Sequence, residues 1–157
     1  THAAIQNIEA EADALKTMAA HLDESVAVFR VDDGASAGST DTSRIKKAKS
    51  DHLLWKMRID DLLKGIEKVR PEDVNTPEQC RLGKWYHAPD NPFRSMPEYQ
   101  ALDRPHGVVH EMARQAAAFF ERGDVKQARR CLKQLRKNSG KVIYLLDRLI
   151  RRIERGK

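Results

Sequence analysis

The sequence predicts an all-α protein, an antiparallel four-helix-type bundle with a coiled-coil helix at its N-terminus. Apolar residues recur at every third or fourth position over most of the chain, which is the period of an amphipathic helix. Only 8 of the 157 residues are glycine and 6 are proline, and five of the prolines fall within residues 71–97. Long helices joined by one irregular, proline-rich crossing account for both observations.

The first predicted helix spans residues 3–29. Its apolar positions form the thin seam of a coiled coil: Ile5, Ile8, Ala12, Leu15, Ala19, Leu22, Val26 and Phe29. Such a helix needs another helix, or a copy of itself, as a partner. Residues 32–43 contain two glycines and no large apolar side chain, so they are predicted to be a flexible linker. The chain is thereby divided into a coiled-coil end (1–31), a linker (32–43) and a helical bundle (44–157).

Within the bundle, the spacing predicts three long helices and one short one. A helix begins after Ser43 and ends at Arg70-Pro71, and a short helix lies near residues 78–86 of the crossing. Pro105 suits the first turn of a helix that ends near Gly123. The last helix spans residues 124–154.

Four side chains that bind divalent metals stand out from this framework. His52 lies in the apolar stripe of the first bundle helix, and His106 and His110 lie four residues apart on the inner stripe of another. An unpaired polar group in a core costs about 1–3 kcal/mol, so three buried imidazoles need a partner. One tetrahedral Zn²⁺ would satisfy them together with the thiolate of Cys80. Copper binds the same ligands tightly, whereas magnesium, calcium and manganese prefer oxygen.

Taken singly, each of these residues has a simpler interpretation. A histidine on an apolar face is most often a core residue with a local hydrogen bond, and a free cysteine is most often a small buried hydrophobe. His87 is a rival ligand because it follows the aromatic pair Trp85-Tyr86 closely. The metal interpretation depends on the four residues occurring together. Carboxylates at Asp51 and at Asp60 or Asp61 are candidates to accept hydrogen bonds from the ligating rings.

Residues close to the ligands in sequence are predicted to shape the site. Trp55 and Trp85 are expected to pack around the metal and limit the access of water, and Tyr86 is a further packing candidate. Cys131 lies near the apolar stripe of the last helix, where it is expected to be a core residue.

Charge and composition exclude several classes of protein. The net charge of +6 is uneven, because residues 1–33 carry −5 and residues 124–157 carry +9. A basic helix of this kind can follow phosphates, but no base-reading motif accompanies it, so nucleic-acid binding is not expected. No apolar run is long enough to span a membrane. Two cysteines make no disulfide framework, which favours a reducing cytoplasm.

The residues resemble a known family. His52-x-x-Trp55, then Cys80-x-Leu82-Gly83-x-Trp85-Tyr86, then His106-x-x-x-His110 is similar to the chemoreceptor zinc-binding domain, a bacterial regulatory module, over about residues 44–155. The resemblance implies that His52, Cys80, His106 and His110 are the zinc ligands. It also implies an antiparallel four-helix bundle that dimerises and is attached to chemoreceptor signalling domains or to diguanylate cyclases. Residues 13–31 are similar to the end of a methyl-accepting signalling hairpin, and a generic heptad helix is the alternative.

The predicted function is therefore regulatory rather than catalytic. Four protein ligands leave no open coordination position, so an enzyme is not expected. The protein is expected to be a cytoplasmic zinc-binding sensor that responds to zinc occupancy, to oxidation of Cys80 by oxidants such as hypochlorous acid, or to both. The alternatives are a structural zinc-stapled dimerisation module and the regulatory domain of a diguanylate cyclase. The implied partners are a second copy and, through a parent receptor, the chemotaxis kinase and its adaptor.

Overall fold

The structure is a computed structural model that describes residues 37–156. Its elements, in chain order, are α2 (Ala37–Leu63), the 3-10 helix η1 (Pro71–Asp73), α3 (Arg81–Tyr86), α4 (Pro97–Gln100), α5 (Asp103–Glu121) and α6 (Val125–Arg155). The described part contains no strand, so the predicted all-α bundle is confirmed. The predicted coiled-coil helix of residues 3–29 lies outside the described residues.

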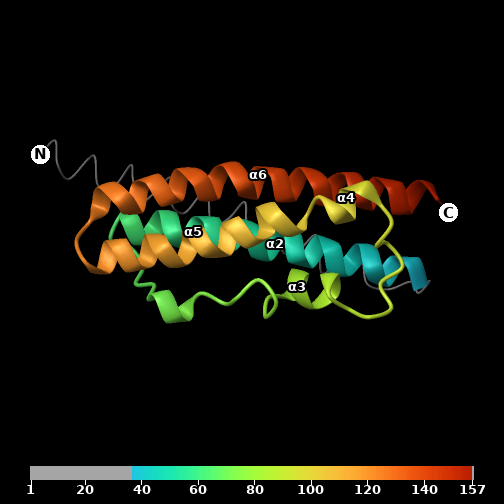
Figure 1. Cartoon of the computed structure of the whole chain (residues 1–157), viewed down its shortest axis with the longest axis horizontal. Helices are drawn as coiled ribbons and strands as arrows, with labels where there is room; N and C mark the ends of the chain where they lie inside the picture. The colour runs from blue at the N-terminus through green and yellow to red at the C-terminus, as the bar shows by residue number, and fades with distance from the viewer. Residues whose placement is uncertain (1–36, 157) are drawn as a thin grey trace, which may run out of the picture.

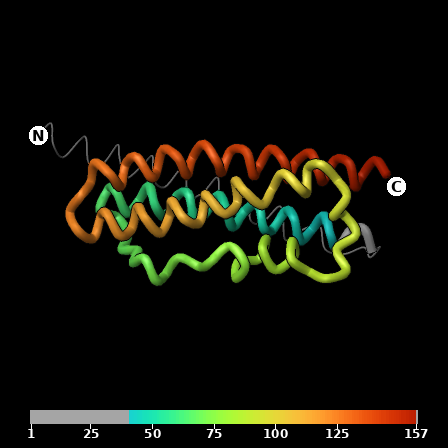
Figure 2. The backbone as a smooth tube through the Cα atoms, in the orientation of Figure 1, coloured from blue at the N-terminus to red at the C-terminus, as the bar shows by residue number. Residues whose placement is uncertain are grey.

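Three long helices make up the body of the described part. α2 and α5 run in the same direction, and α6 runs antiparallel to both (Figure 1). Residues 64–102 connect α2 to α5 by returning along the bundle (Figure 2). This crossing contains three short helices: η1 packs on α5, α3 packs on α2, and α4 packs on α6. Among residues 37–156, every helix is too short or too polar to serve as a membrane span.

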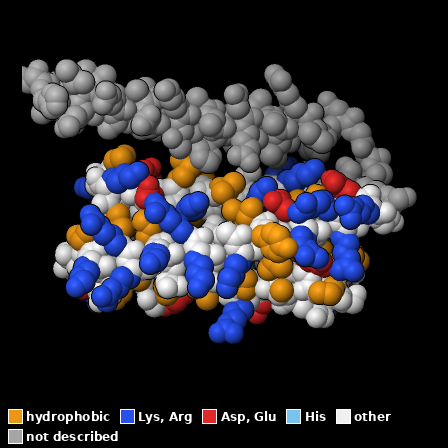
Figure 3. All heavy atoms as spheres, turned by 90° about the horizontal axis from the view of Figure 1, so that it is seen from above, with side chains coloured by type: hydrophobic (Ala, Val, Ile, Leu, Met, Phe, Trp, Pro, Cys, Tyr) orange, Lys and Arg blue, Asp and Glu red, His pale blue; other side chains and the backbone are white. Residues whose placement is uncertain are grey.

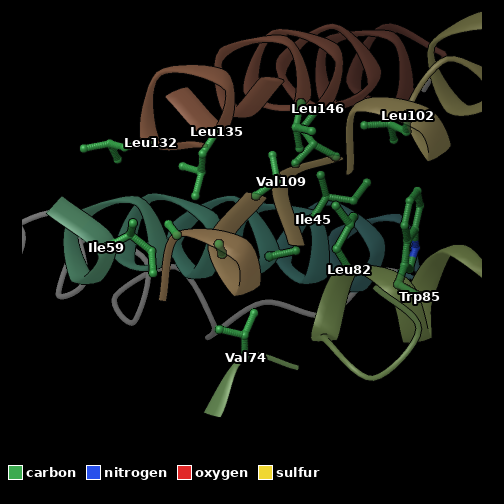
Figure 4. Packing of buried hydrophobic residues seen from close by; sticks show 14 of the residues in the cluster. Ile45, Ile59, Val74, Leu82, Trp85, Leu102, Val109, Leu132, Leu135 and Leu146 are labelled. Carbon is green, nitrogen blue, oxygen red and sulfur yellow. The ribbon is translucent and has the colours of Figure 1, made fainter. Parts of the chain in front are cut away.

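A single apolar cluster fills the space between these helices. Figure 4 shows side chains of α2, α5, α6 and the crossing that point toward one another. Its fully buried large members are Ile45, Ile59, Leu82, Leu102, Leu135, Val142, Leu146 and Leu149. Burying a Leu or Ile side chain contributes about 1.5–3 kcal/mol, so this cluster holds the three helices and the crossing in one unit.

The last two helices form as their sequences predict. α6 starts after Asp124, whose side chain accepts a hydrogen bond from the backbone N–H of Gln127 and so caps the helix. Gly123 (φ +79°) occupies the left-handed region in the tight turn that joins α5 to α6. Cys131 is buried in the core, as expected.

The ends of α2 differ from the prediction. The helix begins at Ala37, so residues 37–43 of the predicted linker are helical. Each polar residue in a helix interior is less favourable than alanine by at most about 0.7 kcal/mol. The burial of Ile45 and Thr42 against the rest of the bundle offsets this destabilisation.

α2 also ends at Leu63 rather than at Arg70. Gly65 (φ +73°) ends the helix in a Schellman motif. Its N–H donates a hydrogen bond to the carbonyl of Leu62, and the N–H of Ile66 donates to the carbonyl of Asp61. Ile66, predicted to lie in the buried stripe, is consequently 67% exposed.

Candidate metal centre

The three predicted histidine ligands lie on two neighbouring helices. His52 belongs to α2, and His106 and His110 belong to α5. All three are buried, with exposed fractions of 4%, 3% and 5%. The ring of His52 lies edge-on to the rings of both α5 histidines, with centroid separations of 5.0 and 5.7 Å. The two helices therefore turn their histidines toward one point in the core.

Cys80 reaches the same point from the crossing. It is the N-cap of α3, and its Sγ accepts a hydrogen bond from Gly83 N–H at 3.3 Å. The thiol also donates to Pro77 O at 3.3 Å. The loop is tight because a Cβ built on Gly83 would lie 1.8 Å from Pro77 O. Only glycine at position 83 allows the chain to pass so close to itself and present the sulfur to α5.

The four candidate ligand atoms form one compact group. One atom from each of His52, Cys80, His106 and His110 lies within 4.8 Å of all the others. Nε2 of His106 lies 3.1 Å from Nε2 of His110 and 3.2 Å from the sulfur of Cys80. In a tetrahedral zinc site, Zn–N and Zn–S bonds place two nitrogens about 3.3 Å apart and a nitrogen and a sulfur about 3.6 Å apart. The group is thus close to the size that a zinc ion requires.

The tautomer of His110 is set by the backbone. Its Nδ1 lies 2.7 Å from Asn75 O, and a carbonyl only accepts, so Nδ1 carries the hydrogen. The lone pair of His110 is then on Nε2, which faces His106. A ring nitrogen that donates to a carbonyl while the other nitrogen points to a metal is the usual arrangement of a ligating histidine.

The histidines are also kept neutral. Burial, and to a lesser extent the neighbouring His106 and His110, lower the pKa of His52 to about 3. Burial and the proximity of His110 lower the pKa of His106 to about 4. Neutral imidazoles have the free lone pairs that metal binding needs. Nδ1 of His52 is buried without a hydrogen-bond partner in the described part of the chain, so the donor set fits a zinc ion.

Comparisons with known proteins agree with this geometry. Residues 52–117 match the family model of the chemoreceptor zinc-binding domain. The chain contains a chemoreceptor zinc-binding domain. The matched range includes all four residues of the group and the parts of α2 and α5 that carry the histidines. Comparison with curated proteins and with solved structures gives no match.

Trp55 lies beside the candidate metal site of the zinc-binding domain. A small cavity of about 20 Å³ touches His52, Cys80 and His110, and Trp55 forms part of its wall. The guanidinium of Arg58 covers the Trp55 ring at 4.5 Å from its centroid. The cavity holds at most about one water molecule, so the surroundings of the ligands are nearly dry.

Trp85 and Tyr86 act on the site through α3. Trp85 packs against Phe93 and Tyr99, and Tyr86 stacks on Tyr99 with ring centroids 4.2 Å apart. Tyr99 also donates a hydrogen bond to the backbone carbonyl of Tyr86. These contacts hold the short helix whose N-cap is Cys80, so both aromatic residues support the position of the sulfur.

The other candidates from the sequence are not among the four clustered residues. His87 packs on the Tyr86 ring and is not among the four clustered residues. Asp51 pairs with Arg81, and Asp60 pairs with Lys64 and Arg136. The hydrogen-bond acceptor that holds His110 is instead the backbone carbonyl of Asn75, for which the sequence carries no signal.

Proposed function

We propose that this chain is a zinc-dependent regulatory region of a bacterial chemoreceptor-type signalling protein, and that it responds to zinc occupancy or to oxidation of Cys80. One observation supports this most strongly: ligand atoms from α2, from the crossing and from α5 meet within 4.8 Å. Binding at that point ties together three elements that are far apart in the sequence. The arrangement of the helices therefore depends on whether the site is filled.

Each of the four side chains has a definite part in this proposal. His52, His106 and His110 bind through neutral nitrogens, and Cys80 binds as a thiolate. Zinc supplies the positive charge that stabilises that thiolate. Without it, burial raises the pKa of the Cys80 thiol above its ordinary value, and the N–H groups of Gly83 and Leu82 offset only part of the rise. Four protein ligands leave no position for a substrate, which supports a regulatory rather than a catalytic role.

The surroundings of the sulfur favour it as the ligand that responds to oxidants. Cys80 is half-buried at the end of a six-residue helix, whereas the histidines are buried on helices of 27 and 19 residues. Hypochlorous acid transfers its oxygen to the thiolate, so that sulfur is oxidised to a sulfenate while chlorine is reduced to chloride. A sulfenate is a weaker ligand, and α3 is then free to move away from α5.

Zinc affinity measured by competition with a chromophoric chelator tests the two signals. We expect Cys80→Ser to lower the affinity, and one equivalent of hypochlorous acid to lower the affinity of the unmodified protein but not that of Cys80→Ser. An affinity that the oxidant leaves unchanged would exclude the redox signal and leave zinc occupancy as the input. Equal affinities for the unmodified protein and Cys80→Ser would exclude Cys80 as a ligand.

A structural zinc staple is the second candidate, because the ligands lie against core residues such as Val109 and Leu82 of the elements they join. A structural site should lose most of its helical circular dichroism when zinc is chelated, whereas a sensor should keep its helices and change their packing. Cytoplasmic location, homodimerisation, coupling to the chemotaxis kinase and its adaptor, and attachment to a diguanylate cyclase instead of a receptor are further proposals. The molecular mass in solution tests homodimerisation, and the sequence of the full gene tests which signalling domain is attached.

A further inference from the structure

The outer face of α6 carries positive charges, most of which have no ion-pair partner among residues 37–156. Eleven exposed Lys or Arg side chains lie on this helix, which is about 46 Å long at 1.5 Å per residue. Eight of them make no ion pair with any residue in the range 37–156, and we call them the basic stripe: Lys126, Arg129, Arg130, Lys133, Lys137, Lys141, Arg151 and Arg155. Figure 3 shows Lys and Arg side chains along the length of the face viewed from above α6.

This spacing destabilises the helix unless an anion is present. Lys133, Lys137 and Lys141 follow one another at intervals of four, and Arg151 and Arg155 do the same. Like charges at that interval repel each other across one turn by a few tenths of a kcal/mol per pair. An acidic partner along the stripe would turn the repulsion into attraction.

A groove beside the stripe indicates what kind of partner fits. It lies between α5 and α6, has a volume of about 820 Å³, and has an apolar floor with basic rims: Arg104, Val108, Lys137, Lys141, Tyr144 and Leu145. Tyr144 is 55% exposed. A phosphate chain would use the cations but not the floor. An acidic amphipathic helix would use both.

The chain itself contains a segment of that description. Residues 3–29 have a coiled-coil seam that needs a partner, and residues 1–33 carry a net charge of −5. In the heptad defined by that seam, the flanking positions that form interhelical ion pairs hold three acidic residues, Glu9, Glu11 and Asp23, and one basic residue, Lys16.

The connection is long enough for this segment to reach the groove. α2 begins at Ala37, at the end of the bundle where α6 finishes, as the ion pair of Lys46 with Glu154 also shows (Figure 1). Residues 30–36 can span up to about 25 Å. A tether of that length gives a millimolar effective concentration, which favours contact within the chain over contact between chains.

We propose that residues 3–29 dock in the groove between α5 and α6 of their own chain, with the seam on the apolar floor and the flanking carboxylates against the basic stripe. The proposal does not depend on zinc. The docked segment, residues 3–29, would contact α5, the helix that carries His106 and His110.

Zero-length carbodiimide cross-linking of the full chain, with peptide mapping by mass spectrometry, tests this proposal. We expect amide links from Glu9, Glu11 and Asp23 to Lys133, Lys137 and Lys141. Lys137→Glu combined with Lys141→Glu should lower the yield of links to Lys133 about tenfold, because two exposed attractions become repulsions. Adding Glu9→Lys and Glu11→Lys to that variant should restore the Asp23 links. Lys84→Glu, on the exposed face of α3, is the matched control and should change nothing.

A mixture of ¹⁴N- and ¹⁵N-labelled protein identifies the source of the acidic segment. Links within a single isotope support docking in the same chain, whereas mixed links would assign the groove to a second copy and overturn the proposal. Links that avoid the stripe, or that persist unchanged in the double charge reversal, would overturn it too. Absence of the links together with salt-dependent binding of duplex DNA would assign the stripe to nucleic acid instead.

Discussion

Replacing Gly83 by alanine should weaken zinc binding without touching a ligand. A Cβ at this position would lie 1.8 Å from Pro77 O and 2.8 Å from Pro77 C, and real Cβ contacts are not shorter than 3.0 Å. The first turn of α3 and the Pro77 backbone must therefore separate by at least 1.2 Å, the difference between 1.8 and 3.0 Å. The obstacle is backbone, so no side-chain rotation relieves it.

The displacement falls on the sulfur ligand. Cys80 Sγ is hydrogen-bonded to both Gly83 N and Pro77 O, so moving these groups apart shifts the sulfur from its place 3.2 Å from His106 Nε2. Losses of supporting contacts around metal ligands cost about 10- to 100-fold in affinity. We expect the zinc dissociation constant of Gly83→Ala to rise by that factor, or about 1.4–2.7 kcal/mol, in chelator competition.

Gly107→Ala is the matched control for this prediction. Gly107 directly follows His106 on α5, yet a Cβ there meets nothing within 4 Å. Alanine should leave zinc affinity unchanged and stabilise the helix by up to about 1 kcal/mol. A Gly83→Ala protein that binds zinc as tightly as Gly107→Ala would show that the close approach to Pro77 does not position Cys80.

Three further predictions concern the fold. The pKa of Glu98 is lowered by its own backbone N–H and by Arg152. The ionised carboxylate therefore stabilises the fold at pH values above 4.5, the ordinary pKa of Glu. This stabilisation is lost as the pH falls through the lower pKa that Glu98 has in the folded state. Urea midpoints of Glu98→Gln should therefore fall below those of the unmodified protein at pH 7 and converge with them as the pH falls through the lowered pKa of the folded state; a gap that stays constant would refute this. Asp124→Ala removes the α6 cap and should cost about 1 kcal/mol in urea unfolding, with no loss meaning that the cap is replaced. Leu146→Ala, at a fully buried position, should cost about 2–5 kcal/mol, and a loss below 1 kcal/mol would contradict its place in the core.

Elements with strong periodicity were predicted well because packing and pattern agree in them. α6 starts and ends within a residue of the predicted range, since its apolar stripe coincides with the buried face and Asp124 caps it. The ligand group was predicted for a related reason. The ring nitrogens of a histidine in an apolar stripe need a bonding partner when the stripe is buried. Three such histidines on two helices, together with one cysteine, can all be satisfied by a single metal ion.

Features that depend on backbone geometry could not be predicted in the same way. The stripe of α2 continues in sequence through Ile66 and Val69, but the left-handed Gly65 ends the helix before them. A glycine three residues past an apolar position is a weak signal, because glycine inside a helix is tolerated at about 1 kcal/mol. The carbonyl of Asn75 that orients His110 is equally hidden, since every residue has a carbonyl.

Zinc K-edge X-ray absorption of the full chain loaded with one equivalent of zinc tests the four-ligand site most directly. The site predicts a first shell of three nitrogens at about 2.0–2.1 Å and one sulfur at about 2.3 Å, and loss of the sulfur distance in Cys80→Ser. A shell of oxygen ligands, or a spectrum that is the same in Cys80→Ser, would contradict the assignment of His52, Cys80, His106 and His110 as the zinc ligands.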